Sequence, residues 1–275
     1  MTSSAASVGL SLNIFFAAAL WCPSTAHAAE PEAYATSLPV SFVDRPLTLP
    51  REVFDVGLSL SGTQWTDSAQ LWFVGAEALY GLDDDLEIGL RLLRAEISRA
   101  PGTGLDSPTG LVALRYFKGR FVELSAAAEV EIPFDPNADL WGRLPALLRP
   151  WPWLRVDFTP SLHARTARRW MWSLGTPTAL SFQLSTAFRV FGLAAFTVPD
   201  VRAFDALLFV PGAGFGYVFE RRGAPSAELI LRCTLGAHAL VGHRPPDPND
   251  GNHVRGEIAL RLFYRDVSDL DTPLF

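Results

Sequence analysis

The sequence predicts an all-β protein, an antiparallel up-and-down transmembrane β-barrel of about twelve strands. Three observations lead to this prediction. Apolar and polar residues alternate with a period of two through most of the chain, the connections between the alternating segments differ regularly in length, and most tyrosines fall at one end of those segments. A strand turns successive side chains to opposite sides, so each segment has one apolar and one polar face.

The composition narrows the class of protein further. Charged residues make up 19% of the 275 residues, and the formal net charge is -6. A protein that binds nucleic acid needs a basic face for the phosphates. The sequence therefore predicts no nucleic-acid partner.

The chain begins with the features of a secretory signal. Residues 8–21, VGLSLNIFFAAALW, form a short apolar run, and Ala26 and Ala28 offer small residues at the two positions that a signal peptidase recognises. The run is too short for a transmembrane helix. We therefore predict a signal peptide over residues 1–28 with cleavage after Ala28, which leaves Cys233 as the single cysteine and no internal disulfide.

The remainder of the chain divides into two parts. Residues 29–51 are rich in Pro and Ala and lack periodicity, so we interpret them as a periplasmic lead segment, either a linker or a plug. Residues 52–275 carry the alternation and form the predicted outer-membrane β-barrel.

The stretch 84–97 shows how each strand is predicted. Leu86 and Leu90 lie on one face of it, and Glu87 and Arg91 lie on the other. The same alternation predicts the other strands at 52–62, 68–81, 108–117, 120–132, 153–163, 167–174, 177–185, 188–198, 207–219, 227–241 and 253–265.

The connections between these segments alternate in length. Short turns are expected at 82–83, 118–119, 164–166, 186–187 and 220–226, and longer loops at 98–107, 133–152, 199–206 and 242–252. The short linkers 63–67 and 175–176 depart from this pattern. Bacterial outer-membrane barrels have short periplasmic turns, longer external loops and an even number of strands, which places both termini on the side of the short turns.

Alternation alone does not separate a membrane barrel from a soluble β-protein, because a half-buried soluble sheet shows it too. The aromatic residues favour the barrel. Four tyrosines are expected on the apolar face at the short-turn end, as an aromatic girdle: Tyr80, Tyr116, Tyr217 and Tyr264. Trp65, Trp151 and Trp153 are expected near the opposite end. The apolar face then points outward, to the lipid bilayer.

Three short stretches resemble a known family. GLDDDLEIGLRL, with its acidic tight turn, RPLTLP before the first strand, and ALSFQLSTAFRV around a strand–turn–strand are similar to a transporter-like family of Gram-negative outer-membrane proteins, some of which belong to phenol-degradation pathways. The resemblance implies a barrel in the outer membrane and a transport role. Phe275 is similar to the terminal aromatic residue of many such barrels, although the closing strand can instead end at Tyr264.

The polar face of the strands supplies the candidate lumen-lining residues. They carry both signs in similar numbers: Glu77, Glu87, Arg91, Arg115, Glu123, Glu129, Glu131, Arg155, Asp157, Arg232, Arg255, Glu257 and Arg261. These side chains either line a water-filled lumen or pair with one another and fill it.

Catalytic and metal sites are not expected. His163 and His238 fall on the polar face, and no Gly-x-Ser-x-Gly signature accompanies them. DPNDGN at 247–252 lacks the ligand spacing of a calcium loop and has the composition of an ordinary turn. We expect no enzyme activity, no cofactor and no metal.

The functional hypothesis is a passive outer-membrane channel or transporter for small solutes. Two alternatives stay open at this point: a closed structural or adhesive barrel whose external loops bind a partner, and a soluble periplasmic β-protein. The sequence leaves the solute and the oligomeric state undetermined.

Overall fold

The computed structural model describes residues 38–65, 70–98, 107–131, 139–166, 170–202, 206–236, 238–241 and 253–264. The chain divides into two compact units, Met1–Ala35 and Thr36–Phe275, and every described residue belongs to the second. The predicted signal peptide and Phe275 therefore lie outside the described residues. In the described part of the chain, no helix has the length and apolar character needed to cross a membrane.

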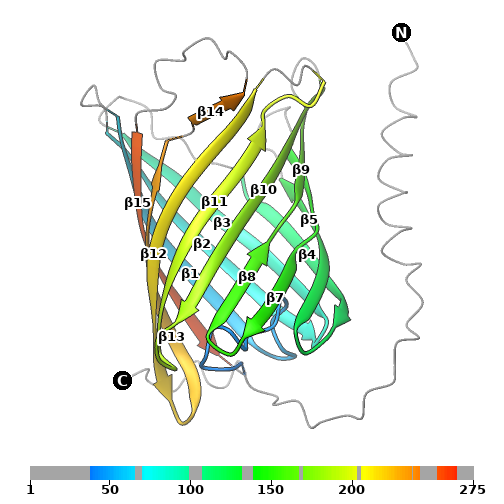
Figure 1. Cartoon of the computed structure of the whole chain (residues 1–275), viewed down its shortest axis with the longest axis vertical. Helices are drawn as coiled ribbons and strands as arrows, with labels where there is room; N and C mark the ends of the chain where they lie inside the picture. The colour runs from blue at the N-terminus through cyan, green and yellow to red at the C-terminus, as the bar shows by residue number, and fades with distance from the viewer. Residues whose placement is uncertain are drawn as a thin grey trace. The chain divides into compact units, whose positions relative to one another are not determined.

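The described residues form a closed antiparallel barrel (Figure 1). All the strands join one sheet, and its order returns on itself because β11 pairs with β10 as well as with β12. The strands are β1 (Phe54–Trp65), β2 (Gln70–Asp83), β3 (Leu86–Ser98), β4 (Thr109–Lys118), β5 (Val122–Glu131), β6 (Asp139–Arg143), β7 (Ala146–Trp151), β8 (Leu154–Phe158), β9 (Ser161–Thr166), β10 (Trp170–Gln183), β11 (Phe188–Val198), β12 (Leu207–Arg221), β13 (Ala224–Leu235), β14 (His238–Val241) and β15 (His253–Tyr264). The predicted class and the predicted number of about twelve wall strands are confirmed.

Two of the wall strands are each built from two short pieces. β6 and β7 both pair with β5 and together make one wall strand, and β8 and β9 both pair with β10 and make the next. Pro145 and Pro160 lie at the two interruptions, where a residue without an N–H cannot donate to the ladder. Their carbonyls still accept, from the N–H of Ser125 and of Leu144 at 2.9 Å each, so the wall stays hydrogen-bonded there.

The structure corrects several predicted strands even though their number holds. Residues 139–151, predicted inside a long loop, form β6 and β7, while the predicted strands 167–174 and 177–185 are one strand, β10. One wall strand was missed and another was counted twice, so the predicted number of strands is still correct. The predicted linker at 175–176 misled because Gly175 and Pro177 resemble a turn, yet both pair with β11.

Two further boundaries differ. The predicted strand 153–163 divides into β8 and β9, and the predicted strand 227–241 divides into β13 and β14.

Tight turns collect at one end of the barrel. They comprise residues 84–85, 119–121, 152–153, 184–187 and 222–223. At the last of these, Arg222 and Gly223 have φ of 54° and 82°, the left-handed conformation that suits a two-residue hairpin. The predicted short turn at 164–166 is wrong, because these residues belong to β9. At the opposite end of the barrel, β3 ends at Ser98 and β11 ends at Val198.

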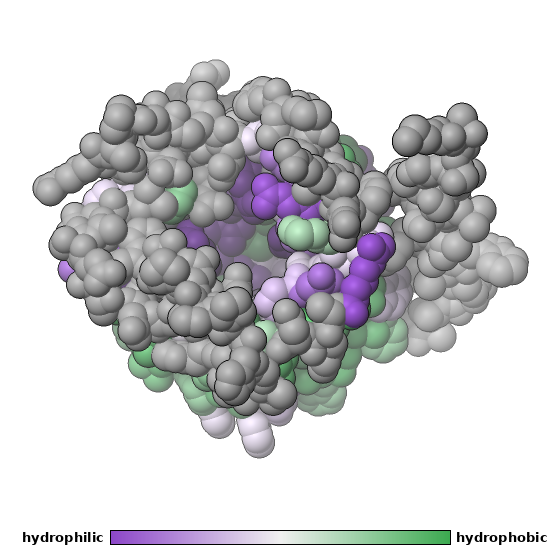
Figure 2. All heavy atoms as spheres, turned by 90° about the horizontal axis from the view of Figure 1, so that it is seen from above, coloured by the Kyte–Doolittle hydropathy of each residue, from purple (hydrophilic) through white to green (hydrophobic). Residues whose placement is uncertain are grey.

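The two faces of the wall have opposite character. Large apolar side chains on the outer face are exposed, among them Leu58 at 50% and Ile258 at 48%, whereas Asp55 and Glu228 on the inner face are fully buried. Seen from the end opposite the tight turns, the hollow shows hydrophilic residues and the outer rim shows hydrophobic ones (Figure 2). A soluble β-protein buries its apolar face, so this arrangement is that of a barrel surrounded by lipid.

Candidate functional site: the barrel lumen

The lumen contains a segment of the chain that precedes the barrel. Residues 38–53, here called the plug, lie inside the barrel at the tight-turn end, beneath the middle of the wall in Figure 1. Leu38, Leu49 and Val53 of the plug form a small buried apolar cluster with Phe263 of β15. This cluster is the apolar part of the contact between the plug and the wall.

A buried ionic cluster holds the centre of the plug. Arg45 of the plug donates to the Glu228 carboxylate at 2.5 Å, and Arg189 of β11 donates to its other oxygen at 2.8 Å. The Glu228 side chain is 0% exposed, and both arginines are buried. Burying a charge is costly unless it is paired and hydrogen-bonded, so Glu228 is stable here only with its two partners in place.

Two arginines of the wall bind the backbone of the plug. Arg149 of β7 donates to the carbonyls of Val43 and Arg45 at 2.6 and 2.9 Å. Arg155 of β8 donates to the carbonyls of Phe42 and Arg45 at 2.9 and 2.7 Å. These bonds satisfy plug carbonyls that have no strand partner, as a buried backbone requires.

The Phe42 ring lies between guanidinium groups. The guanidinium carbon of Arg189 is 3.4 Å from the ring centroid, and that of Arg155 is 4.3 Å from it. A cation close to an aromatic face is attracted by the ring quadrupole. The ring therefore helps to hold neighbouring positive charges in one small volume.

Carboxylates of the wall accept the plug's backbone N–H groups. Leu47 donates to Glu123 at 3.0 Å, and Leu49 donates to Glu87 at 2.8 Å. The Glu123 carboxylate also binds Arg115 and Arg149, at 3.3 and 2.8 Å. Each carboxylate thus joins the plug to the wall through charge-assisted hydrogen bonds.

A water-accessible cavity lies further along the lumen. This upper cavity has a volume of about 370 Å³. Its charged lining residues are Arg91, Arg232, Arg255, Arg261, Glu77 and Glu257, and the hydroxyls of Ser59 and Ser61 lie among them. Arg261 binds Asp55, which lies one residue into β1.

Another part of the lumen wall holds a polar network around His163. The His163 ring stacks on Trp141 with centroids 4.8 Å apart, its Nδ1 is 3.4 Å from Ser173 Oγ, and its Nε2 is 3.4 Å from Asp139. The residue types are those of a hydrolase triad, but both distances are at the long limit of a hydrogen bond. The stacking of His163 on Trp141 explains why the histidine lies here, as a packed side chain of the barrel wall. The side chain of His238 lies outside the described residues.

The sequence-predicted polar residues occupy three places in the lumen. Packed at the tight-turn end, around or next to the plug, are Glu87, Arg115, Glu123, Arg155 and Asp157. Around the upper cavity are Glu77, Arg91, Arg232, Arg255, Glu257 and Arg261. On β5, against β6, are Glu129, which binds Arg143 at 2.8 Å, and Glu131, which accepts from the Asp139 N–H at 3.1 Å.

Several residues that hold the plug escaped sequence reasoning. Glu228 occurs on the polar face of a predicted strand, and burial is what distinguishes it. Arg149 fell in a predicted loop and Arg45 in the lead segment without periodicity. Arg189 was recognisable as a lone charge in an apolar strand.

The four predicted girdle tyrosines lie near the tight-turn ends of their strands. Tyr80 and Tyr264 are both in register with Phe54 of β1, and the rings of Phe54 and Tyr80 are 4.4 Å apart. Tyr116 and Tyr217 are exposed on the outer face. Whether these rings mark a membrane interface stays a prediction.

The tryptophan prediction is partly wrong. Trp151 ends β7, Trp153 belongs to the tight turn that follows, and their rings stack with centroids 5.5 Å apart. They lie at the same end as the tyrosines, because residues 146–151 form a strand that runs down to that turn.

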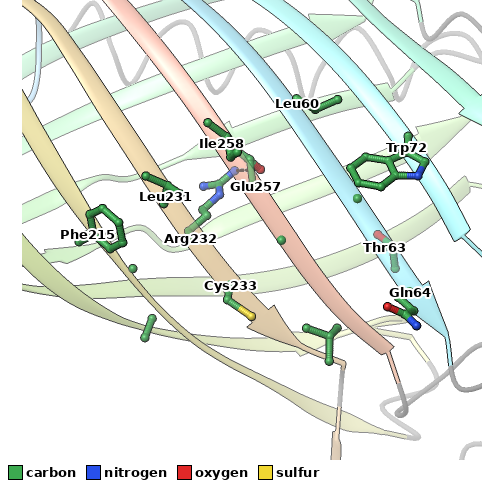
Figure 3. Close-up of a pocket in the computed structure, with 15 residues that line it drawn as sticks. Leu60, Thr63, Gln64, Trp72, Phe215, Leu231, Arg232, Cys233, Glu257 and Ile258 are labelled. Atoms are coloured by element: carbon green, nitrogen blue, oxygen red, sulfur yellow. Dashed lines mark hydrogen bonds and ion pairs between the residues drawn. The ribbon is translucent and has the colours of Figure 1, made fainter.

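The outer wall carries a shallow apolar groove of about 730 Å³ (Figure 3). Small residues of neighbouring strands share one register there: Gly62, Gly256, Cys233 and Ala213. The ladders of β15 with β1 and with β13 are continuous past the groove. Hydrogen-bonded wall therefore separates it from the upper cavity, although the Arg232–Glu257 pair lies just behind it (Figure 3).

Metal binding has no candidate in the described part of the chain, where no three His, Cys, Asp or Glu residues converge in a way that could hold an ion.

A closed twelve-strand barrel with an apolar outside and a charged lumen is the architecture of outer-membrane channels and porins. The sequence matches no known protein-family model and no curated protein. Its fold, however, is similar to that of an outer membrane channel from Pseudomonas putida F1, with a TM-score of 0.57 and 12% identity over 79% of this chain and 97% of that one.

Two porins have similar folds. The NanC porin has a TM-score of 0.56 and 6% identity over 74% of this chain and 98% of its own. The KdgM porin, solved in complex with disordered oligogalacturonate, has a TM-score of 0.52 and 5% identity over 76% and 98%. At these identities the likeness establishes the fold and leaves the solute open.

Proposed function

We propose that the protein is a passive channel for small polar solutes in the outer membrane of a Gram-negative bacterium, closed at its periplasmic end by the plug. The observation that carries this proposal is the division of the lumen into a charged, water-accessible upper cavity and a tight-turn end filled by residues 38–53. A purely structural barrel has no need of a hydrated cavity lined by exposed arginines.

The location follows from the same features. An apolar outer face suits lipid, and tyrosines and tryptophans at the tight-turn end suit the periplasmic interface. The predicted signal peptide over residues 1–28 and the folds of the similar channels and porins support this location.

The plug's contacts indicate how the channel opens. Backbone hydrogen bonds join the plug to the wall at its C-terminal end, where Glu52 donates to Gly81 at 2.9 Å and Gly81 donates to Val53 at 3.0 Å. The other plug–wall hydrogen bonds described above involve side chains, so the rest of the plug can leave without breaking a rung between two wall strands. We infer that the closed state converts to an open one by movement of residues 38–53.

Single-channel recording in a planar bilayer tests the proposal. The wild-type protein should show rare openings, and Arg149→Ala with Arg155→Ala should raise the open probability by removing four bonds to plug carbonyls. Arg165→Ala is the matched control, because Arg165 lies on the inner face of β9 and contacts Asp139 at 3.6 Å. Silence of both the wild-type protein and the double variant, with assembly intact, would contradict a channel and favour a closed structural barrel.

A further inference from the structure

The upper cavity carries more positive than negative charge. Four of its lining residues are arginines, from β3, β13 and β15, and two are glutamates, from β2 and β15: Arg91, Arg232, Arg255, Arg261, Glu77 and Glu257. Asp55 balances Arg261 at the floor of the cavity. The other three arginines face two glutamates.

The Glu257 carboxylate is shared by two arginines. It accepts from Arg232 at 2.6 Å and lies 3.7 Å from a guanidinium nitrogen of Arg255. The Arg232 side chain is 46% exposed and that of Arg255 is 37% exposed. The Arg255 guanidinium also donates to Ser61 Oγ at 3.3 Å. Arg232, the more exposed of the two, keeps N–H donors that the Glu257 carboxylate does not occupy in contact with the water of the cavity.

Arg91 adds a third guanidinium from the other side of β1 and β2. It is exposed and lies in register with Glu77, and it forms no ion pair with any side chain that the structure describes. Glu77 itself lies close to Gly57, where the absence of a Cβ leaves room for it.

Apolar side chains make up part of the remaining lining, next to the hydroxyls of Ser59 and Ser61. Phe73, Ala76, Ile230 and Ala259 line it beside the arginines. A solute that satisfies both the arginines and the apolar side chains has an anionic group and an apolar body, and the volume of about 370 Å³ has room for a small organic molecule.

We propose that the upper cavity is a binding site for a small organic monocarboxylate, so that the solute of the channel is an anion. This inference rests on the proposed function. A guanidinium matches a carboxylate through two parallel N–H···O bonds, and the exposed guanidinium groups of Arg91 and Arg232 both line the cavity. The excess of positive charge also raises the local concentration of anions.

Equilibrium binding to the folded full-length protein in detergent micelles tests the site. Benzoate is the probe, followed by ligand-observed NMR, and benzamide, benzylammonium and inorganic phosphate are the comparison ligands. Benzoate should bind at least about tenfold more tightly than benzamide, because a charge-assisted hydrogen bond is lost in the amide. Equal binding of benzamide or of phosphate would overturn the assignment of a monocarboxylate.

Variants of the cavity sharpen the test. Arg91→Gln and Arg232→Gln should each weaken benzoate binding by about tenfold. Glu257→Gln should tighten it, because the Arg232 guanidinium loses its charged partner and the cavity loses a negative charge. The matched control Arg165→Gln should leave the affinity unchanged, since Arg165 is an exposed lumen arginine outside the cavity lining.

The outcomes separate this inference from the channel function. Binding does not require conduction. If benzoate binds to a protein that never conducts, the proposed channel function is refuted and the proposed carboxylate site is still supported. Conduction with a benzoate affinity that neither Arg91→Gln nor Glu257→Gln changes would overturn the carboxylate site and leave the channel. Heat-modifiable gel mobility confirms that each variant has assembled.

Discussion

Replacing Glu228 by Gln should release the plug. The Glu228 carboxylate is fully buried and accepts from Arg45 at 2.5 Å and from Arg189 at 3.1 and 2.8 Å. Neutralising it leaves two buried guanidinium groups without a counter-charge. Breaking a buried ion pair in this way costs about 3–5 kcal/mol.

Movement of the plug can relieve most of that cost, since it takes Arg45 into water and hydrates Arg189. We therefore expect the population with a displaced plug to rise roughly 10²- to 10⁴-fold in Glu228→Gln, the range that 3–5 kcal/mol corresponds to. The barrel wall should persist, because its ladders do not involve the plug.

Cysteine accessibility measures this opening. Thr48→Cys in a Cys233→Ser background places a thiol at a plug position that is 1% exposed, and its rate of reaction with a maleimide reports how often the plug is displaced. Glu257→Gln is the matched control, because Glu257 is also a paired lumen carboxylate but does not contact the plug.

The net charge of the buried cluster distinguishes two variants, Arg45→Gln and Glu228→Gln. Arg45→Gln leaves Arg189 and Glu228 as a neutral pair, so it should open the plug much less than Glu228→Gln. A faster thiol reaction in Arg45→Gln than in Glu228→Gln would refute this reasoning. Loss of barrel assembly in Glu228→Gln would instead show that Glu228 serves the wall.

Other predictions concern the wall, the lumen and the N-terminus. Leu90→Arg puts a charge on the lipid-facing side and should cost about 2–4 kcal/mol, seen as reduced assembly by gel mobility, whereas Leu90→Ala should be mild. Gly214→Ala forces a Cβ against the backbone of β13 and the Phe191 ring and should destabilise by about 1–3 kcal/mol in urea unfolding, while Gly256→Ala meets open space and should be tolerated. Arg91→Glu should shift the reversal potential of the open channel toward cations. Mass spectrometry of the mature protein should place its N-terminus at Ala29.

The barrel was predictable because apolar and polar residues alternate along each strand of its wall. In β3, Leu86, Ile88 and Leu90 alternate with Glu87 and Arg91, and the structure places the two sets on opposite faces. Any strand with one face in lipid and the other in the lumen must show this period. The strand number agreed as well, but only because one wall strand was missed and another was divided in two.

Strand prediction from alternation failed where proline or glycine interrupted the alternating residues. Gly175 and Pro177 suggested a turn inside β10, and Pro145 and Pro150 interrupted the alternation across β6 and β7. A barrel tolerates such residues because neighbouring strands can still bond to the proline carbonyl. The alternation along one strand does not reveal which neighbouring strand donates to the proline carbonyl.

The plug could not be predicted in detail because its partners are spread along the whole chain. Residues 38–53 have no periodicity of their own, and their contacts reach from Glu87 on β3 to Glu228 on β13. Only the closed barrel brings these side chains to one level. The sequence also could not decide between a water-filled lumen and a lumen filled by ion pairs. The structure contains both, because the water-accessible upper cavity lies above the buried ion pairs around the plug.

The side-chain anchoring of the plug also fixes an order of events during assembly. The groups that hold it come from β3, β5, β7, β8, β11 and β13, so its docking site does not exist until those strands have met. Before that moment Glu228 and Arg189 face water and carry no desolvation cost. The first residues of the barrel unit to be synthesised are therefore the last to reach their final position, and an intermediate with a complete wall and an undocked N-terminal segment should accumulate whenever docking is slow.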